Sequence, residues 1–208
     1  MVDNGKSKTK RGRPGWVSFA IFAICALPVI AAWWFLKALE QEGEFATRNY
    51  GELIRPARPL EETTLKTLEG KDFTLSELKG KWTLVVFGPA ACDDICQENL
   101  YETRQIRLAV GKEMQRVQRL WVVNDVGSLS ESDWLEEQHP DLLIASEGEK
   151  KKGFIDQFVL PKVPDPLAAQ RVYIVDPIGN IVITYPPEEA PEHILKDLKR
   201  LLFVSQIG

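Results

Sequence analysis

The longest apolar run in the chain covers residues 16–36 and contains no charged residue. A run of this length is sufficient to cross a bilayer as a helix. Trp16, Trp33 and Trp34 lie near its two ends, where aromatic side chains favour the membrane interface. A cleaved signal peptide is the alternative, because Ala31-Ala32 are small residues after an apolar stretch. Since the run continues into further aromatic residues, the pattern favours an uncleaved transmembrane anchor.

Beyond the anchor, residues 37–60 are charged and contain Pro56 and Pro59, which indicates a juxtamembrane linker. From residue 61 to 208, short apolar runs and amphipathic segments alternate, with turn residues between them. Predicted strands cover 63–68, 71–75, 82–88, 120–124, 142–145, 171–176 and 181–185, and predicted helices cover 98–114, 130–139, 153–160 and 192–204. This order predicts an α/β fold with a mixed sheet and helices on both faces.

Charge is distributed unevenly along the chain, whose formal net charge is −4. Residues 1–15 form a basic tail with five basic residues and one acidic residue, so the remainder carries a net charge of −8. Positive residues ahead of a span place the N-terminus in the cytoplasm and the rest of the chain outside it. We therefore expect a bacterial inner-membrane protein with a periplasmic domain. An acidic domain also argues against nucleic acid as a partner.

The candidate chemistry lies where the apolar strand 82–88 ends. Gly88-Pro89 interrupts the strand, and Cys92 and Cys96 follow at the start of a helix-permissive segment. Residues four apart lie on one face of a helix. Free backbone N–H groups and the helix dipole at such a junction favour a thiolate. The pattern predicts a redox-active or metal-binding thiol pair. A cysteine pair after the first central strand, followed much later by a hairpin and a closing helix, is the thioredoxin arrangement.

Three segments carry a resemblance to a known family. The run 70–82 is similar to the entry of membrane-anchored thioredoxin-like proteins, and Cys92-Asp93-Asp94-Ile95-Cys96 resembles the C-P-D-V-C-like motif of the Sco/SenC family. Residues 173–179 resemble that family's strand and turn after its metal-ligand histidine. The resemblance covers roughly residues 50–205. It implies a copper chaperone or thiol–disulfide reductase of cytochrome c oxidase assembly, with oxidase subunits or other assembly factors as partners.

The resemblance also implies roles for the two cysteines. Cys92 and Cys96 would form the redox pair, as a disulfide when oxidised, and would be the thiolate ligands of Cu(I). The family's histidine ligand would fall at about Ala168, where this chain has none. The two histidines, His139 and His193, are expected to be solvent-exposed or helix-capping residues. A third ligand is not identifiable, since Met1 and Met114 are the only methionines.

Two further departures keep alternative functions open. Thioredoxin-like reductases place a cis-proline directly before the strand that opens the final hairpin, where this chain has Ala169-Gln170-Arg171. Asp93 and Asp94 between the cysteines also oppose thiolate formation by like-charge repulsion. The alternatives are a general periplasmic thiol–disulfide oxidoreductase, or a non-catalytic thioredoxin-like interaction module with a structural cysteine pair. Whether the protein is an enzyme is left open by the sequence.

Overall fold

The computed structural model describes residues 15–42, 49–129, 133–147, 153–205 and 207 of the chain. Nearly all of the basic tail 1–15 and the start of the helix predicted over 130–139 lie outside the described residues. The chain divides into two compact units, Met1–Arg48 and Asn49–Gly208. Each unit is described by itself below.

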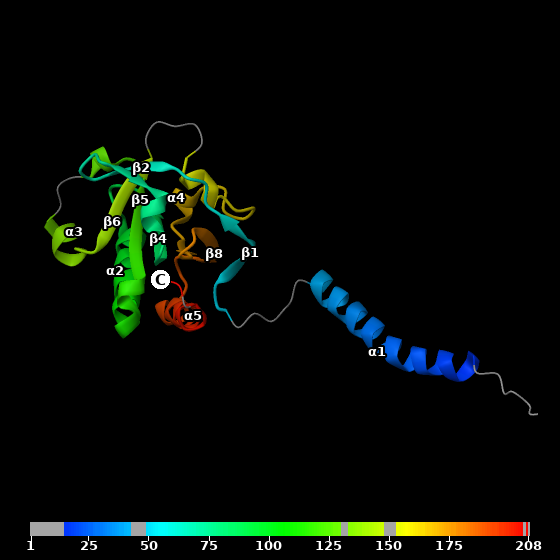
Figure 1. The fold of residues 1–208 in the computed structure, drawn as a ribbon. Helices are drawn as coiled ribbons and strands as arrows, with labels where there is room; N and C mark the ends of the chain where they lie inside the picture. Colours follow the sequence, from blue (N-terminus) through cyan, green and yellow to red (C-terminus); the bar gives the residue numbers. More distant parts are fainter. Residues whose placement is uncertain (1–14, 43–48, 130–132, 148–152, 206, 208) are drawn as a thin grey trace, which may run out of the picture. The chain divides into compact units, whose positions relative to one another are not determined.

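The described part of the first unit, residues 15–42, is the helix α1, which runs from Gly15 to Glu42 (Figure 1). Its segment Gly15–Lys37 is long and apolar enough to cross a membrane, as judged by length and composition. Apolar side chains cover the helix on all sides, and Cys25 is an exposed free cysteine within it. The predicted apolar helix is therefore confirmed.

The second unit is built on one eight-stranded sheet with the order β1-β8-β7-β4-β5-β6-β2-β3 (Figure 1). The strands are β1 Glu52–Pro59, β2 Thr64–Thr67, β3 Asp72–Thr74, β4 Trp82–Gly88, β5 Val117–Val123, β6 Leu142–Glu147, β7 Val172–Val175 and β8 Asn180–Tyr185. Strands β4, β5 and β6 are parallel, whereas β7 is antiparallel to β4 and β8 is antiparallel to β7. Both predicted hairpins, β2–β3 and β7–β8, are confirmed.

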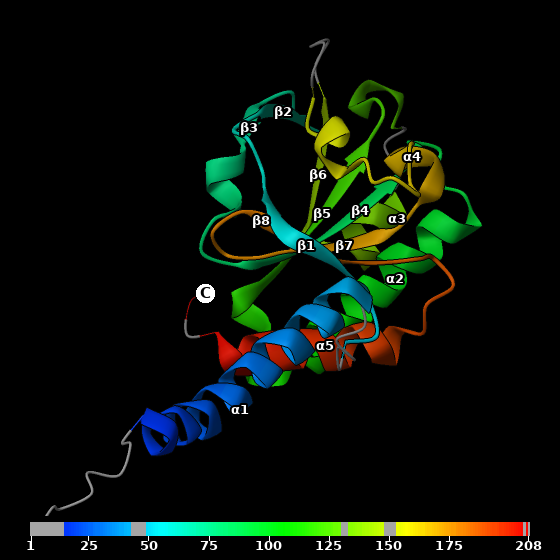
Figure 2. The ribbon, with the colours of Figure 1, turned by 90° about the vertical axis from the view of Figure 1, so that its right-hand side faces the viewer.

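Helices cover both faces of this sheet, as predicted for an α/β fold. The helices are α2 Asp94–Ala109, α3 Asp133–Gln138, α4 Pro166–Ala169 and α5 Pro191–Val204, and the 3₁₀ turns are η1 Leu75–Leu78, η2 Gly111–Arg116, η3 Val126–Ser128 and η4 Ile155–Phe158. Helices α2 and α5 pack side by side on one face (Figure 2). Elements η1, η4 and α4 cover the other face. The helix predicted over 153–160 is only the 3₁₀ turn η4.

Each face has its own apolar core because successive strand residues point to opposite sides of the sheet. Leu84 and Val86 of β4 belong to the core under α2 and α5. Val85 and Phe87 of the same strand belong to the core under η4, where Phe87 makes edge contacts with Phe158. Every residue of β4 is buried, as expected for a central strand covered on both faces.

The linker predicted over 37–60 is wrong for residues 52–59, which form the edge strand β1 paired with β8. Pro56 and Pro59 made this segment look unlike a strand, because proline has no N–H to donate to a sheet. An edge strand tolerates proline, since one of its sides needs no partner. The pairing with β8 is accordingly irregular, with a register shift between Leu53 and Arg58.

A buried carboxylate fixes the chain where it enters this unit. Asp197 of α5 is 1% exposed and accepts hydrogen bonds from the backbone N–H groups of Tyr50, at 2.8 Å, and Gly51, at 3.1 Å. The Tyr185 hydroxyl donates a third hydrogen bond at 3.1 Å. Gly51 has to be glycine here, because a Cβ would lie 2.4 Å from Ile183 Cγ2. The entry point is thus held to β8 and α5 together.

Candidate functional site

Strand β4 delivers the cysteine pair to the junction between the sheet and α2. The strand ends at Gly88, and Pro89 cannot continue the ladder because it lacks an N–H. Residues 89–91 lead into Cys92, whose N–H donates to the Pro89 carbonyl at 3.0 Å. Helix α2 then begins at Asp94 and contains Cys96 in its first turn. The site therefore lies at the carboxyl end of a central strand, a position common for functional groups in α/β sheets.

Cys92 and Cys96 are joined by a disulfide with a Cα–Cα distance of 5.1 Å. Cys92 is 4% exposed and Cys96 is fully buried. Cys92 has a left-handed backbone conformation, with a φ of 38°, so it is not part of the helix that holds Cys96. Both sulfur-bearing side chains belong to the core under α2 and α5. A partner would approach the pair from the side of Cys92.

Asp93 caps α2 and holds the second cysteine in position. Its Oδ1 accepts a hydrogen bond from the Cys96 N–H at 3.0 Å, which satisfies one of the free donors of the first helical turn. Its Oδ2 accepts a second hydrogen bond from Nε2 of Gln170 at 2.8 Å. Asp94 is exposed in the first turn of the helix. Of the two carboxylates between the cysteines, Asp93 is therefore a helix cap.

Gln170 is the residue at this site that the sequence pattern did not reveal. It is buried, has a left-handed φ of 46°, and is separated from β7 by one residue, Arg171. Its carbonyl accepts a hydrogen bond from Nδ2 of Asn99 on α2 at 2.8 Å, and its side-chain amide reaches Asp93. Gln170 thus lies in the segment 169–171, where thioredoxin-like reductases place a cis-proline. Ala168, the expected histidine position, is exposed on α4.

His139 is not the exposed or capping residue that was predicted. It is 5% exposed, and its Nδ1 lies 3.3 Å from Nη2 of the buried Arg119. Burial lowers the pKa of His139 to about 4, and the positive charges of Arg119 and Arg104 add to this effect. The prediction failed because a histidine just before a proline gives no periodic signal of burial. The contacts of His139 are with Trp134 and Arg119, and neither cysteine is among its partners in the described residues.

His193 is half-buried and also makes contacts away from the pair. Its Nδ1 lies 2.5 Å from Oε1 of Glu189, and its ring stacks on Tyr50 with a centroid distance of 4.0 Å. Met114 packs against the core. Among the residues that the structure describes, no three His, Cys, Asp or Glu side chains are grouped so that they could hold a metal ion. Within the described residues, no His, Cys, Asp or Glu side chain therefore adds a third metal ligand to the cysteine pair.

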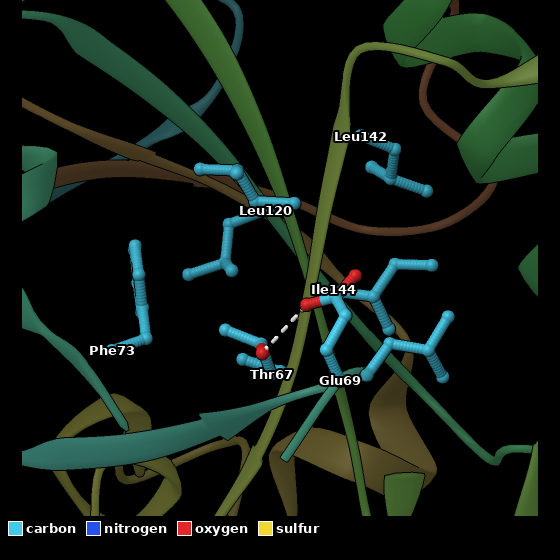
Figure 3. Close-up of a pocket in the computed structure, with 9 residues that line it drawn as sticks. Thr67, Glu69, Phe73, Leu120, Leu142 and Ile144 are labelled. Atoms are coloured by element: carbon cyan, nitrogen blue, oxygen red, sulfur yellow. Dashed lines mark hydrogen bonds between the residues drawn. The ribbon is translucent and has the colours of Figure 1, made fainter. Parts of the chain in front are cut away.

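A small cavity lies away from the cysteines, between the β2–β3 hairpin and strands β5 and β6 (Figure 3). It has a volume of about 130 Å³ and is lined mainly by leucines and other apolar side chains, with Leu120, Leu142 and Ile144 among them. Thr67 and Glu69 close one side through a hydrogen bond of 2.8 Å between their side chains. Neither cysteine lines it, so we assign it no part in the chemistry of the pair.

Comparison with protein families gives a match over most of the second unit. The model of the family described as transmembrane-like, thioredoxin-like, C-terminal domain matches residues 82–205. This segment contains both cysteines, Gln170 and the closing helix α5. No curated protein matches the chain.

Solved structures with the same fold include three copper-bound Sco proteins. Bradyrhizobium japonicum ScoI with copper bound is 26% identical, with a TM-score of 0.54 over 69% of this chain and 99% of that one. Yeast Sco1 with copper bound is 18% identical, with a TM-score of 0.59 over 73% and 96%. Arabidopsis thaliana ScoI with copper bound is 18% identical, with a TM-score of 0.57 over 70% and 98%. The thioredoxin-like mixed sheet predicted from sequence is confirmed.

Proposed function

The chain belongs to the transmembrane-like, thioredoxin-like C-terminal domain family, and from this premise we propose that it is a membrane-anchored, Sco-like accessory factor for assembly of the cytochrome c oxidase copper centre. It would act through Cys92 and Cys96 as a thiol–disulfide reductase of copper-site cysteines. The observation that carries this proposal is the disulfide at the strand-to-helix junction of a Sco-like fold. Burial of both sulfurs within one core fits a pair that cycles between two defined states.

The reaction we propose moves two electrons from the reduced pair to a partner disulfide. The Cys92 thiolate attacks one sulfur of the partner, and the partner disulfide breaks to leave a mixed disulfide and a partner thiolate. The Cys96 thiolate then attacks Cys92, which releases the second partner thiolate and forms the Cys92–Cys96 disulfide. Cys92 is the partner-facing residue because it is the more exposed of the two and precedes the helix. Cys96 is the resolving residue.

Copper handling is the second candidate, supported by the copper-bound Sco proteins that share the fold. Cu(I) would be cargo here, held by the thiolates of Cys92 and Cys96, which are the soft ligands it prefers. The Gln170 amide and the Asp93 carboxylate offer only hard oxygen atoms on this side of the pair. The donor set is therefore better suited to thiol–disulfide exchange than to a stable three-ligand copper site.

We also infer a location for the two units. The basic residues before α1 favour an N-terminus in the cytoplasm, with α1 as a single-pass anchor in the bacterial inner membrane and the sheet domain in the periplasm. Disulfides form and persist in that oxidising compartment. A reductase of copper-site cysteines would be needed there, because free cysteine pairs in the periplasm tend to oxidise.

The test is an exchange assay with the full chain in detergent micelles. The reduced protein is mixed with a cuproprotein domain whose copper-ligand cysteines have been oxidised to a disulfide. We expect about one partner disulfide to be reduced per chain, and none with the C92S/C96S variant. An anaerobic Cu(I) titration against a chelator, with the same variant as control, tests the second candidate. If the wild type neither exchanges nor binds Cu(I), and the variant only loses stability, the pair is structural and the proposal fails.

A further inference from the structure

The indole N–H of Trp121, on β5, is a buried donor without an acceptor. Trp121 is fully buried, and its Nε1 has no hydrogen-bond partner among the described residues. Buried donors are nearly always paired, because leaving one unpaired costs about 1–3 kcal/mol. An exception beside a candidate redox site therefore calls for an explanation.

The position of Gly88 places this donor beside the sulfur of Cys96. A Cβ built on Gly88 would lie 3.2 Å from Cys96 Sγ and 3.3 Å from Trp121 Nε1. The indole nitrogen and the sulfur thus converge on one point at the end of β4, and glycine leaves that point free of side-chain atoms. Trp121 and Cys96 also belong to the same apolar core, the one under α2 and α5.

The two redox states of the pair differ in what they offer this donor. A disulfide sulfur is a weak acceptor, whereas a thiolate carries a full negative charge and accepts a strong, charge-assisted hydrogen bond. In the disulfide form Nε1 has no partner. Once the S–S bond is broken, the Cys96 sulfur is free to turn about its Cα–Cβ bond, and the donor is already in its neighbourhood.

We propose that Trp121 is a positioning residue that donates its indole N–H to the Cys96 thiolate of the reduced protein. This inference rests on the proposed thiol–disulfide function. The hydrogen bond stabilises the Cys96 thiolate, and with it the reduced form, relative to the disulfide. It therefore raises the reduction potential of the pair.

The same contact acts when a dithiol reduces the Cys92–Cys96 disulfide. A thiolate of the dithiol attacks Cys92 Sγ, the Cys92–Cys96 bond breaks, and Cys96 leaves as a thiolate with the electron pair of that bond. The second thiol of the dithiol then loses its proton and displaces Cys92 from the mixed disulfide, so the dithiol ends as a disulfide. A leaving thiol with a lower pKa leaves faster, so the N–H of Trp121 accelerates the first step.

Substitution W121F tests the proposal because it removes the N–H and keeps an aromatic ring. The full chain in detergent micelles is equilibrated with dithiothreitol redox buffers, and free thiols are counted by alkylation. We expect the equilibrium to shift about tenfold toward the disulfide, which equals a potential about 30 mV lower for a two-electron couple. Reduction by dithiothreitol should slow in parallel.

Trp82 supplies the matched control. It is 5% exposed, and its Nε1 also has no partner among the described residues. It lies on β4 six residues before Gly88, about 20 Å from the end of the strand. W82F should change the equilibrium less than twofold. An unchanged equilibrium in W121F, or an equal shift in W82F, would overturn the proposal.

A measurement on the unmutated protein covers the case in which W121F does not fold. With ¹⁵N-labelled tryptophan, the indole N–H signal of Trp121 should move downfield on reduction, and the signal of Trp82, assigned with W82F, should stay in place. A spectrum in which no indole signal moves downfield on reduction would contradict the hydrogen bond. If the cuproprotein exchange assay fails but W121F still lowers the reduction potential of the pair, the proposed function is wrong and the role of Trp121 stands.

Discussion

Arg119 and Trp121 lie two residues apart on β5, so their side chains emerge on the same face of the sheet, toward α2. Both are buried polar side chains, yet their surroundings differ. Arg119 donates to Leu100 O at 2.6 Å and also contacts Thr103, Asp141 and His139, each at 3.3 Å. The Trp121 N–H has no hydrogen-bond partner in the part of the chain that the structure describes. A buried polar group with its hydrogen bonds made stabilises the fold, whereas a buried donor without an acceptor, beside a disulfide, is available to a thiolate once the disulfide is reduced.

The largest expected effect comes from removing the satisfied group. Burial lowers the pKa of Arg119 to about 10, partly offset by Asp141, so the side chain remains charged at neutral pH. We expect R119M to lower the free energy of unfolding by about 3 kcal/mol, because it removes charge-assisted hydrogen bonds from the core. Urea unfolding of the full chain in a mild detergent, followed by circular dichroism, measures this loss.

Two controls sharpen this result. Arg107 also pairs with Asp141, at 3.2 Å, but its side chain is 21% exposed, so R107M should cost less than about 1 kcal/mol. The reduction potential of Cys92–Cys96 should be unchanged in R119M, provided that the variant folds. If R119M lowered the free energy of unfolding as little as R107M, the structural role assigned to Arg119 would be wrong.

A second, smaller effect is a pH dependence carried by His139, which is neutral in the fold. Its pKa is about 4 in the folded protein, below its ordinary value near 6.5, so only the unfolded chain takes up this proton as the pH falls between these values. The wild type should therefore lose about 2 kcal/mol relative to H139Q between pH 7 and pH 5.

The comparison with H139Q separates the contribution of His139 from that of Glu102, which also titrates in this pH range. Burial and the charges of Glu98 and Glu192 raise the pKa of Glu102 to about 7. Its contribution falls as the pH rises through that value, in the opposite sense to His139, but it is the same in both proteins. If the free energy of unfolding varied with pH in parallel in the wild type and H139Q, burial beside Arg119 would not be keeping His139 neutral.

The smallest expected effect concerns Asp93, which links the cysteine pair to Gln170. D93A should destabilise the fold by about 1 kcal/mol, because the Cys96 N–H loses its capping acceptor. D93S should restore most of this loss, since serine also caps helices well. D94A, at the exposed neighbour, should cost only a few tenths of a kcal/mol. Equal losses in D93A and D94A in the same unfolding assay would mean that charge near the helix start matters here, and not the cap.

The elements of the sheet domain could largely be predicted from sequence because their signals are local. The apolar run of β4, the Pro177–Asn180 turn and the period of α5 each reflect residues close together in the chain. Strand β1 was missed because its prolines oppose strand formation everywhere except at a sheet edge. Whether a segment lies at an edge depends on the whole topology, which no local pattern contains.

The cysteine pair was also visible as a motif, whereas its surroundings were not. Gln170 lies 77 residues from Asp93, and its hydrogen bond depends on a left-handed turn before β7. Trp121 Nε1 and Cys96 Sγ both lie near Gly88 because β5 pairs with β4 in one register, with Val86 opposite Trp121. His139 was misjudged for the same reason, since its burial depends on an arginine 20 residues earlier. Such contacts follow from the register of the sheet and not from spacing in the sequence.

The Asp197 contacts have a mechanical consequence. Any pull transmitted along the chain from the N-terminal helix first reaches Tyr50 and Gly51, whose N–H groups are held by the Asp197 carboxylate. That load passes into α5 and, through Tyr185, into β8. Strand β4 is separated from β8 by β7, so it is two strands away from the loaded element. Tension on the tether thus enters the sheet domain at α5 and β8, and within the sheet it is two strands away from the strand that leads to the cysteines.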